Sequence, residues 1–163
     1  AYHVKTTRMG FSQGHDNKTN QAYVGIELCS WGCLKKVGGE FYDISGTVKI
    51  PNDQVCILDK PFRTYKYWHK FTPAQIMKTF KLLQYLGEEL GIDWTDLTNE
   101  PEEVNADWLE MDWDAMVVGM GYGFGRQLIS HTTLEYGKFD IFPQPEILSM
   151  INALYKGEDY VPA

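Results

Sequence analysis

One segment, residues 72–91, constrains the fold of this chain most, because it contains the start, the apolar stripe and the end of a long helix. Thr72 can cap the first turn, Pro73 suits the first helical position, and Gln75 completes a capping box. Apolar side chains then recur at helical spacing before Gly91: Ile76, Phe80, Leu83, Leu86 and Leu90. The spacing predicts a helix over residues 72–90 that packs its stripe on a sheet and supplies core rather than chemistry.

A second helix is predicted over residues 145–156. Its first residue is a proline, which suits a first turn, and Gly157 directly after it is a typical terminator. Four apolar side chains are expected to face inward: Ile147, Leu148, Ile151 and Leu154.

Strands are predicted in the first half of the chain. Gly38-Gly39 is a turn signal between residues 35–37 and 40–45, which indicates a hairpin, and another strand is expected near residues 54–58. Residues 23–29 predict a buried strand, because the run is short and largely apolar.

The expected architecture is one domain over residues 1–163. With 44% hydrophobic and 14% aromatic residues, the chain has enough apolar material for a real core. We expect a mixed α/β fold in which a central β-sheet is flanked by the two α-helices.

Charge is distributed unevenly and excludes some partners. Residues 82–125 hold eleven acids and no Lys or Arg, so they carry −11, while the rest carries +4 (15 bases minus 11 acids). Nucleic acid is not an expected partner, because a phosphate backbone demands a basic face. No run of 18 apolar residues is present, so no membrane span is predicted. Residues 92–125 are interpreted as an acidic, tryptophan-containing insertion with a solvated surface.

Three cysteines, Cys29, Cys33 and Cys56, cannot all pair within one chain. We interpret them as small buried thiols of a protein made in a reducing cytosol. The first residues show no apolar signal-peptide core, although such a signal could have been removed.

The segment that carries most chemistry is residues 127–145. A short apolar stretch, residues 128–130, is expected to end a strand and deliver His131, which is followed by Lys138 and Asp140. Imidazole and carboxylate are ordinary ligands of a zinc ion that keeps an open position for water, and a nearby lysine can stabilise an oxyanion. The pattern favours a hydrolytic metal site, against the plainer alternative of a loop histidine near a solvated acid.

The aromatic and basic segment at residues 62–70 leaves two interpretations open. Its rings could stack on sugars, or they could simply pack in the core, which is the commoner use of aromatic clusters.

Together these motifs resemble the zinc-dependent N-acetylmuramoyl-L-alanine amidases, which include phage amidase-type lysozymes and peptidoglycan recognition proteins. The resemblance is carried by Asn20 with Val-Gly-Ile-Glu-Leu at residues 24–28, by Phe-Arg-x-x-x-Tyr-Trp at residues 62–68, and by the late His, Lys-x-Asp and Phe-Pro-Gln-Pro. It implies that His131 and Asp140 bind Zn²⁺, that Glu27 activates the bound water, and that Lys138 stabilises the oxyanion. The implied partner is bacterial peptidoglycan, and the implied site of action is the cell wall.

The family's third zinc ligand, a histidine on an early strand, has no counterpart before residue 23. The opening Ala1-Tyr2-His3 instead resembles an Ala-Trp-His of the family that lies shortly before the Gly-Ile-Glu strand, so the chain is expected to match the later two-thirds of the domain. Three explanations stay open: a processed or truncated chain, a ligand from another chain, or replacement by His3 or His15. We favour the first two.

Two other functions remain as alternatives. Some members of the family bind peptidoglycan without cleaving it, and the domain could also be a structural component of a phage-like particle. The presence of Glu27, His131, Lys138 and Asp140 together favours the bacteriolytic enzyme. Phage entry, lysis, wall recycling and killing of competitors are not distinguished.

Overall fold

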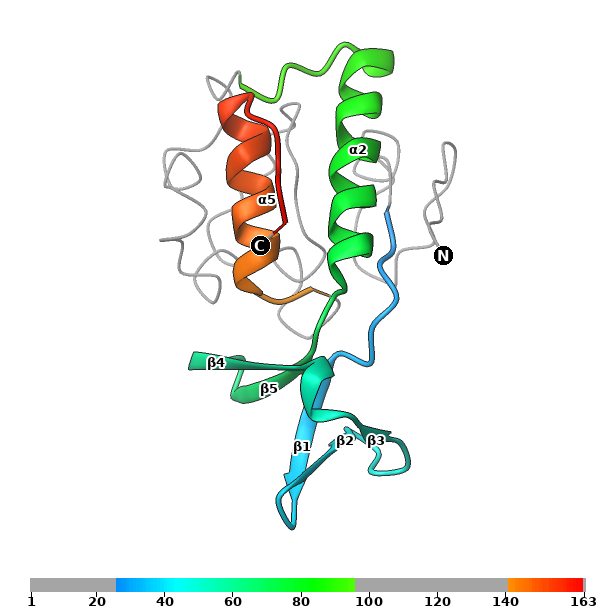
Figure 1. Ribbon diagram of the computed structural model, residues 1–163, viewed down its shortest axis with the longest axis vertical. Helices are drawn as coiled ribbons and strands as arrows, with labels where there is room; N and C mark the ends of the chain where they lie inside the picture. Colours follow the sequence, from blue (N-terminus) through cyan, green and yellow to red (C-terminus); the bar gives the residue numbers. More distant parts are fainter. Residues whose placement is uncertain (1–25, 96–140, 163) are drawn as a thin grey trace, which may run out of the picture.

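The computed structural model describes residues 26–95 and 141–162, which form a mixed α/β structure (Figure 1). The predicted α/β class is therefore confirmed for this part of the chain. Its elements in chain order are strands β1 (Cys33–Val37), β2 (Glu40–Asp43) and β3 (Lys49–Ile50), the short 3₁₀ helix η1 (Asn52–Gln54), strands β4 (Val55–Phe62) and β5 (Tyr65–His69), and helices α2 (Pro73–Leu90) and α5 (Pro145–Lys156).

The strands form an antiparallel sheet in the order β3-β2-β1-β5-β4. The predicted hairpin is confirmed: Val37 pairs with Glu40, and Gly38 and Gly39 fill the two-residue turn with φ values of 58° and 89°. Such a turn needs positive φ at both positions, which glycine adopts without steric cost. The predicted strand near residues 54–58 is also confirmed and continues to Phe62.

The two faces of the sheet bury different clusters, because successive side chains of a strand point to opposite sides. One face places Trp68 of β5 between Cys33 of β1 and Cys56 of β4, and these residues belong to the main core cluster. The opposite face carries a smaller cluster: Leu34, Phe41, Ile50 and Val55.

Helix α2 begins and ends as its sequence predicts. The Gln75 backbone N–H donates to Thr72 Oγ1 (3.2 Å), and the Thr72 backbone N–H donates to Gln75 Oε1 (2.8 Å), so the capping box is complete. Gly91 takes the left-handed conformation that ends the helix. The apolar stripe is shorter than predicted, because Leu90 is 55% exposed.

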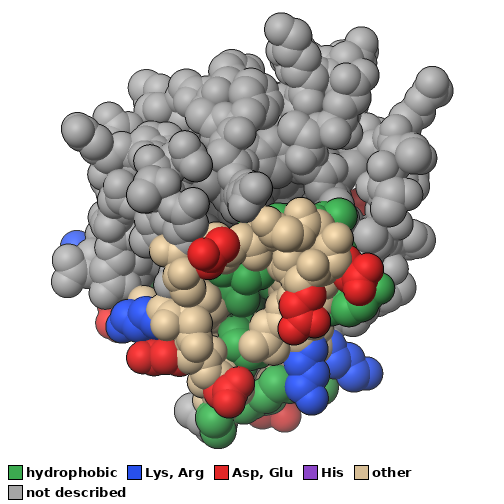
Figure 2. Space-filling view, turned by 90° about the horizontal axis from the view of Figure 1, so that it is seen from above, with side chains coloured by type: hydrophobic (Ala, Val, Ile, Leu, Met, Phe, Trp, Pro, Cys, Tyr) green, Lys and Arg blue, Asp and Glu red, His purple; other side chains and the backbone are tan. Residues whose placement is uncertain are grey.

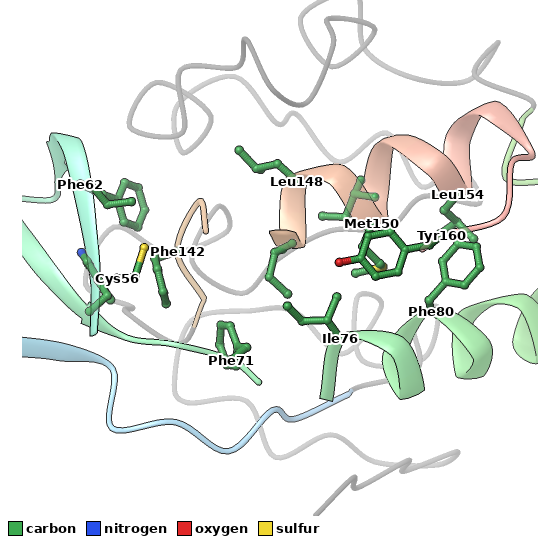
Figure 3. Close-up of a cluster of buried hydrophobic side chains, with 14 of the residues drawn as sticks. Cys56, Phe62, Phe71, Ile76, Phe80, Phe142, Leu148, Met150, Leu154 and Tyr160 are labelled. Atoms are coloured by element: carbon green, nitrogen blue, oxygen red, sulfur yellow. The ribbon is translucent and has the colours of Figure 1, made fainter. Parts of the chain in front are cut away.

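Helix α5 also matches its prediction, including the buried side chains of Ile147, Leu148, Ile151 and Leu154. In the described part, the stripe of α2 packs mainly against α5 rather than against the five-stranded sheet (Figures 1 and 3). The predicted strand residues 23–25 and 128–130 lie outside the described ranges, so packing of this stripe on a larger sheet stays a prediction. Neither described helix is long and apolar enough to cross a membrane.

Aromatic side chains join the sheet to the helices. Phe142, which precedes α5, stacks on Trp68 of the sheet with ring centroids 4.8 Å apart. It also stacks on Phe71, two residues before the start of α2, with ring centroids 5.7 Å apart (Figure 3). The core therefore continues from the sheet through Phe142 into the space between the helices.

The described beginning of the acidic stretch is solvated, as predicted. Glu88 and Glu89 of α2 and Asp93 after it are exposed. Figure 2 looks onto this end of the molecule and shows acidic side chains around apolar ones. Of the predicted insertion at residues 92–125, only 92–95 lie within the described residues.

Candidate functional site

Glu27, the predicted catalytic carboxylate, is exposed. Its neighbours Ile26 and Leu28 are half-buried and pack against the main core cluster. Residues 26–29 belong to no strand, so the prediction of a buried strand acid is wrong for this part, while residues 23–25 lie outside the described ranges. The alternation of half-buried and exposed side chains leaves the carboxylate accessible to a ligand in solvent.

A side chain of α2 holds the backbone just after Glu27. Gln75 Nε2 donates to the carbonyl oxygen of Cys29 at 2.8 Å. The same side chain accepts hydrogen bonds through Oε1 from the backbone N–H (2.8 Å) and the hydroxyl (3.0 Å) of Thr72. One glutamine therefore connects the start of α2 to the segment that contains Glu27.

A second contact holds the same segment at the end of β5. Ser30 Oγ donates to the backbone carbonyl of His69 (3.0 Å) and lies 3.2 Å from its Nδ1, and the Trp31 backbone N–H donates to that Nδ1 (3.4 Å). Since Nδ1 accepts, Nε2 carries the ring proton and faces Gln54 Oε1 at 3.3 Å. Burial lowers the pKa of His69 below 6.5, which favours this neutral form.

Sequence reasoning missed the contacts of His69 with Ser30 and Gln54. The three residues come from distant parts of the chain, and no local pattern links them. Only the antiparallel pairing of β5 with β1 and β4 brings them together. Their hydrogen bonds fix the backbone of residues 30–32 to the sheet.

His131, Lys138 and Asp140, the other predicted site residues, lie outside the described residues. So do His3, His15 and the predicted strand end at residues 128–130. The chain directly after Asp140 is described: Ile141 is half-buried and packs against the main core cluster, as Ile26 and Leu28 do.

Gln144 holds this later segment against the start of α2. Its side chain is buried, accepts through Oε1 from the Phe71 backbone N–H (2.8 Å) and donates through Nε2 to the Phe71 carbonyl (3.1 Å). The segments next to Glu27 and next to Asp140 are thus both hydrogen-bonded to residues 71–75.

The aromatic, basic segment is largely core. Trp68 is fully buried, with its Nε1 donating to the Tyr65 carbonyl at 3.1 Å, and Phe62 is buried beside it. This burial supports the packing interpretation for these two rings. Tyr67 lies on the opposite face, where its ring meets Phe41 edge-on and Lys36 approaches both rings.

The three thiols differ in exposure. Cys33 and Cys56 are buried, and burial raises the pKa of both, that of Cys56 to about 11, so they stay neutral at physiological pH. Cys29 is exposed, which corrects the prediction of three buried thiols.

Within residues 26–95 and 141–162, no three His, Cys, Asp or Glu side chains are grouped as metal ligands would be. The predicted ligands His131 and Asp140 are outside these ranges, so zinc binding stays a prediction. Their donor atoms, an imidazole nitrogen and a carboxylate oxygen, are of the kind that zinc takes.

No protein-family model, curated protein or solved structure matches the chain. The amidase resemblance therefore remains a prediction from the motifs around Glu27 and His131.

Proposed function

We propose that this chain is a zinc-dependent N-acetylmuramoyl-L-alanine amidase domain, with the central sheet and flanking helices of that family. It hydrolyses the amide between N-acetylmuramic acid and L-alanine in bacterial peptidoglycan. One observation carries the proposal: Glu27, His131, Lys138 and Asp140 occur in the family's order and within its surrounding motifs. Each of the four supplies a group that amide hydrolysis requires.

In this proposal His131 and Asp140 would hold the zinc ion, together with a third ligand from another segment or another chain. When bound, zinc would supply Lewis-acid chemistry, polarising the amide carbonyl and lowering the pKa of water to roughly 7. Glu27 accepts the proton of the attacking water and passes it to the leaving nitrogen as the carbon–nitrogen bond breaks. The Lys138 ammonium stabilises the negative charge on the carbonyl oxygen.

Two structural observations support this assignment. The exposed carboxylate of Glu27 can reach a polymeric substrate that stays outside the protein. Ile26 and Leu28, on either side of Glu27, pack on the same cluster as Ile141, which directly follows Asp140 in the chain. This shared packing favours joint action of the early and late motifs.

The test is release of stem peptides from purified peptidoglycan by the natural protein with any chain that co-purifies. We expect release that a chelator abolishes and added zinc restores. Glu27→Ala should lower the rate at least about a hundredfold, within the range ascribed to general acid–base catalysis. Glu89→Ala, which removes an exposed acid on α2, is the matched control and should leave the rate unchanged.

The same assay separates the alternatives. Binding to peptidoglycan without release would make the chain a recognition module, and neither binding nor release would favour a structural component of a particle. Intact mass and zinc stoichiometry of the natural protein identify which polypeptide supplies the third ligand. We expect one zinc per complex.

A further inference from the structure

We propose that Gln75 is a positioning residue for Glu27, because it ties the backbone two residues after Glu27 to the start of α2. The inference rests on the proposed amidase activity, in which Glu27 must meet the proton of the attacking water.

The side chain of Gln75 is oriented before it meets the Glu27 segment. Its Oε1 accepts from the Thr72 backbone N–H at 2.8 Å and from the Thr72 hydroxyl at 3.0 Å. These donors identify Oε1 as the atom that faces Thr72, so Nε2 faces the Cys29 carbonyl at 2.8 Å. The capping box therefore holds the amide in the orientation that its hydrogen bond to the Cys29 carbonyl, here called the tie, requires.

The tie lies where the Glu27 segment has no strand pairing. Residues 26–32 belong to no strand, so a sheet ladder does not fix their register. Ile26 and Leu28 hold the segment by packing on the core, and Ser30 and Trp31 hold it by hydrogen bonds to His69. The Cys29 carbonyl lies between these two sets of contacts.

A positioning role predicts a specific kinetic effect. A general base works only within hydrogen-bond reach of the proton that it abstracts, and a displacement of about 1 Å can cost up to about a hundredfold in rate. Release of the tie moves Glu27 without removing it. We therefore expect kcat to fall while KM stays near the wild-type value.

Substitutions at Gln75 and Thr72 separate the effect of losing the tie from the effect of weakening the helix cap. Gln75→Glu keeps an oxygen that accepts from the Thr72 N–H but loses the donor to the Cys29 carbonyl. Thr72→Ala removes the hydroxyl of the cap, while the Thr72 backbone N–H still orients the Gln75 amide, which can still donate to the Cys29 carbonyl. Gln75→Met lacks the donor and also the acceptor of the cap, and it adds no charge. Comparison with Gln75→Glu separates the lost hydrogen bond from the new carboxylate, and comparison with Thr72→Ala shows the effect of a weakened cap.

The experiment measures kcat and KM for peptidoglycan cleavage by the full natural protein and the three variants. We expect Gln75→Glu and Gln75→Met to lower kcat on the order of tenfold with little change in KM, whereas Thr72→Ala stays within about twofold of wild type. Hydrogen–deuterium exchange of residues 26–32 should be faster in both Gln75 variants and unchanged in Thr72→Ala.

An active wild type with equal kcat in the Gln75 variants would overturn the positioning role and leave the amidase assignment intact. Equal loss in all three variants would also overturn it, because helix capping would then explain the effect. A zinc-loaded wild type that releases no peptide would overturn the proposed function, and the positioning role with it.

Discussion

At the scale of single residues, Asp43 shows how a loop can depend on one carboxylate. It ends β2 and accepts hydrogen bonds from the backbone N–H groups of Thr47 (2.8 Å), Val48 (2.7 Å) and Ser45 (3.3 Å), and from the Ser45 hydroxyl. These bonds, that of the Ser45 hydroxyl first, lower the pKa of Asp43 from 3.8 to about 2. The charged form therefore stabilises the turn that leads into β3.

We predict that Asp43→Asn lowers the free energy of unfolding at neutral pH, because the amide accepts fewer and weaker hydrogen bonds. A folded pKa below the unfolded one means that the unfolded chain binds more protons in this range. The contribution of Asp43 is therefore complete above pH 4 and is lost as the pH falls towards 2. Urea unfolding at pH 6 and pH 2.5 should show a smaller difference between wild type and variant at the lower pH.

Asp53→Asn is the control for this prediction, because Asp53 is an exposed acid on η1. Its stability should follow that of the wild type at both pH values. A pH-independent loss in Asp43→Asn would contradict the electrostatic explanation and point to altered loop shape instead.

At the scale of elements, the sequence correctly predicted the features that depend on interactions within a few residues. The capping box around Thr72, the glycine after each helix and the Gly38-Gly39 turn act within a few residues, so the bounds of α2, α5 and the hairpin could be predicted. Strand β5 could not, because it is defined by pairing with β1 and β4 rather than by its own pattern.

Gly87 of α2 lies against the side chain of Trp94, which follows the helix and leaves no room for a larger residue at this position. Trp94 lies over Gly87 and donates from Nε1 to the Leu83 carbonyl at 3.1 Å. A Cβ at Gly87 would lie 2.4 Å from that nitrogen and 3.1 Å from the Ile92 carbonyl oxygen. Gly87 therefore permits the close approach of the Trp94 indole and is not needed by the helix itself.

We predict that Gly87→Ala destabilises the protein by roughly 1–3 kcal/mol, the usual cost of overpacking. In an unobstructed helix the same change would stabilise by about 1 kcal/mol. The sign should therefore reverse, or the cost should largely disappear, in a Trp94→Ala background. Thermal unfolding of the four proteins of this double-mutant cycle measures the coupling, and purely additive effects would contradict the contact.

At the scale of the whole molecule, the sequence predicted the helices but not which elements they meet. The stripe of α2 was expected to face a sheet, yet it faces α5 in the described part. Likewise, nothing local marks Phe142 and Gln144, which lie beside prolines, as the residues that join sheet and helices. Of the candidate site, the sequence suggests which groups would react, and these assignments stay predictions, whereas the exposure of Glu27 depends on long-range packing.

Gln144 provides the test of this long-range connection. It is 1% exposed, and its amide satisfies both the N–H and the carbonyl of Phe71, 73 residues away in sequence. Gln144→Met keeps the volume but leaves both backbone groups without this partner, at roughly 1–3 kcal/mol for each buried group. The expected result is a large loss in urea unfolding, which a wild-type stability of Gln144→Met would contradict.

Gln144→Glu distinguishes this hydrogen-bonding role from simple filling of space. Its carboxylate would be buried facing the Phe71 carbonyl, so its pKa should rise above the unfolded value of about 4.3. With a raised folded pKa, the protonated form supplies stability that is complete below pH 4 and is lost as the pH rises through the folded pKa. The destabilisation relative to wild type should therefore be larger at pH 7 than at pH 4. Because Gln144→Met adds no titrating group, its deficit should be the same at both pH values. A pH-independent deficit in Gln144→Glu would contradict burial of this side chain against the Phe71 carbonyl.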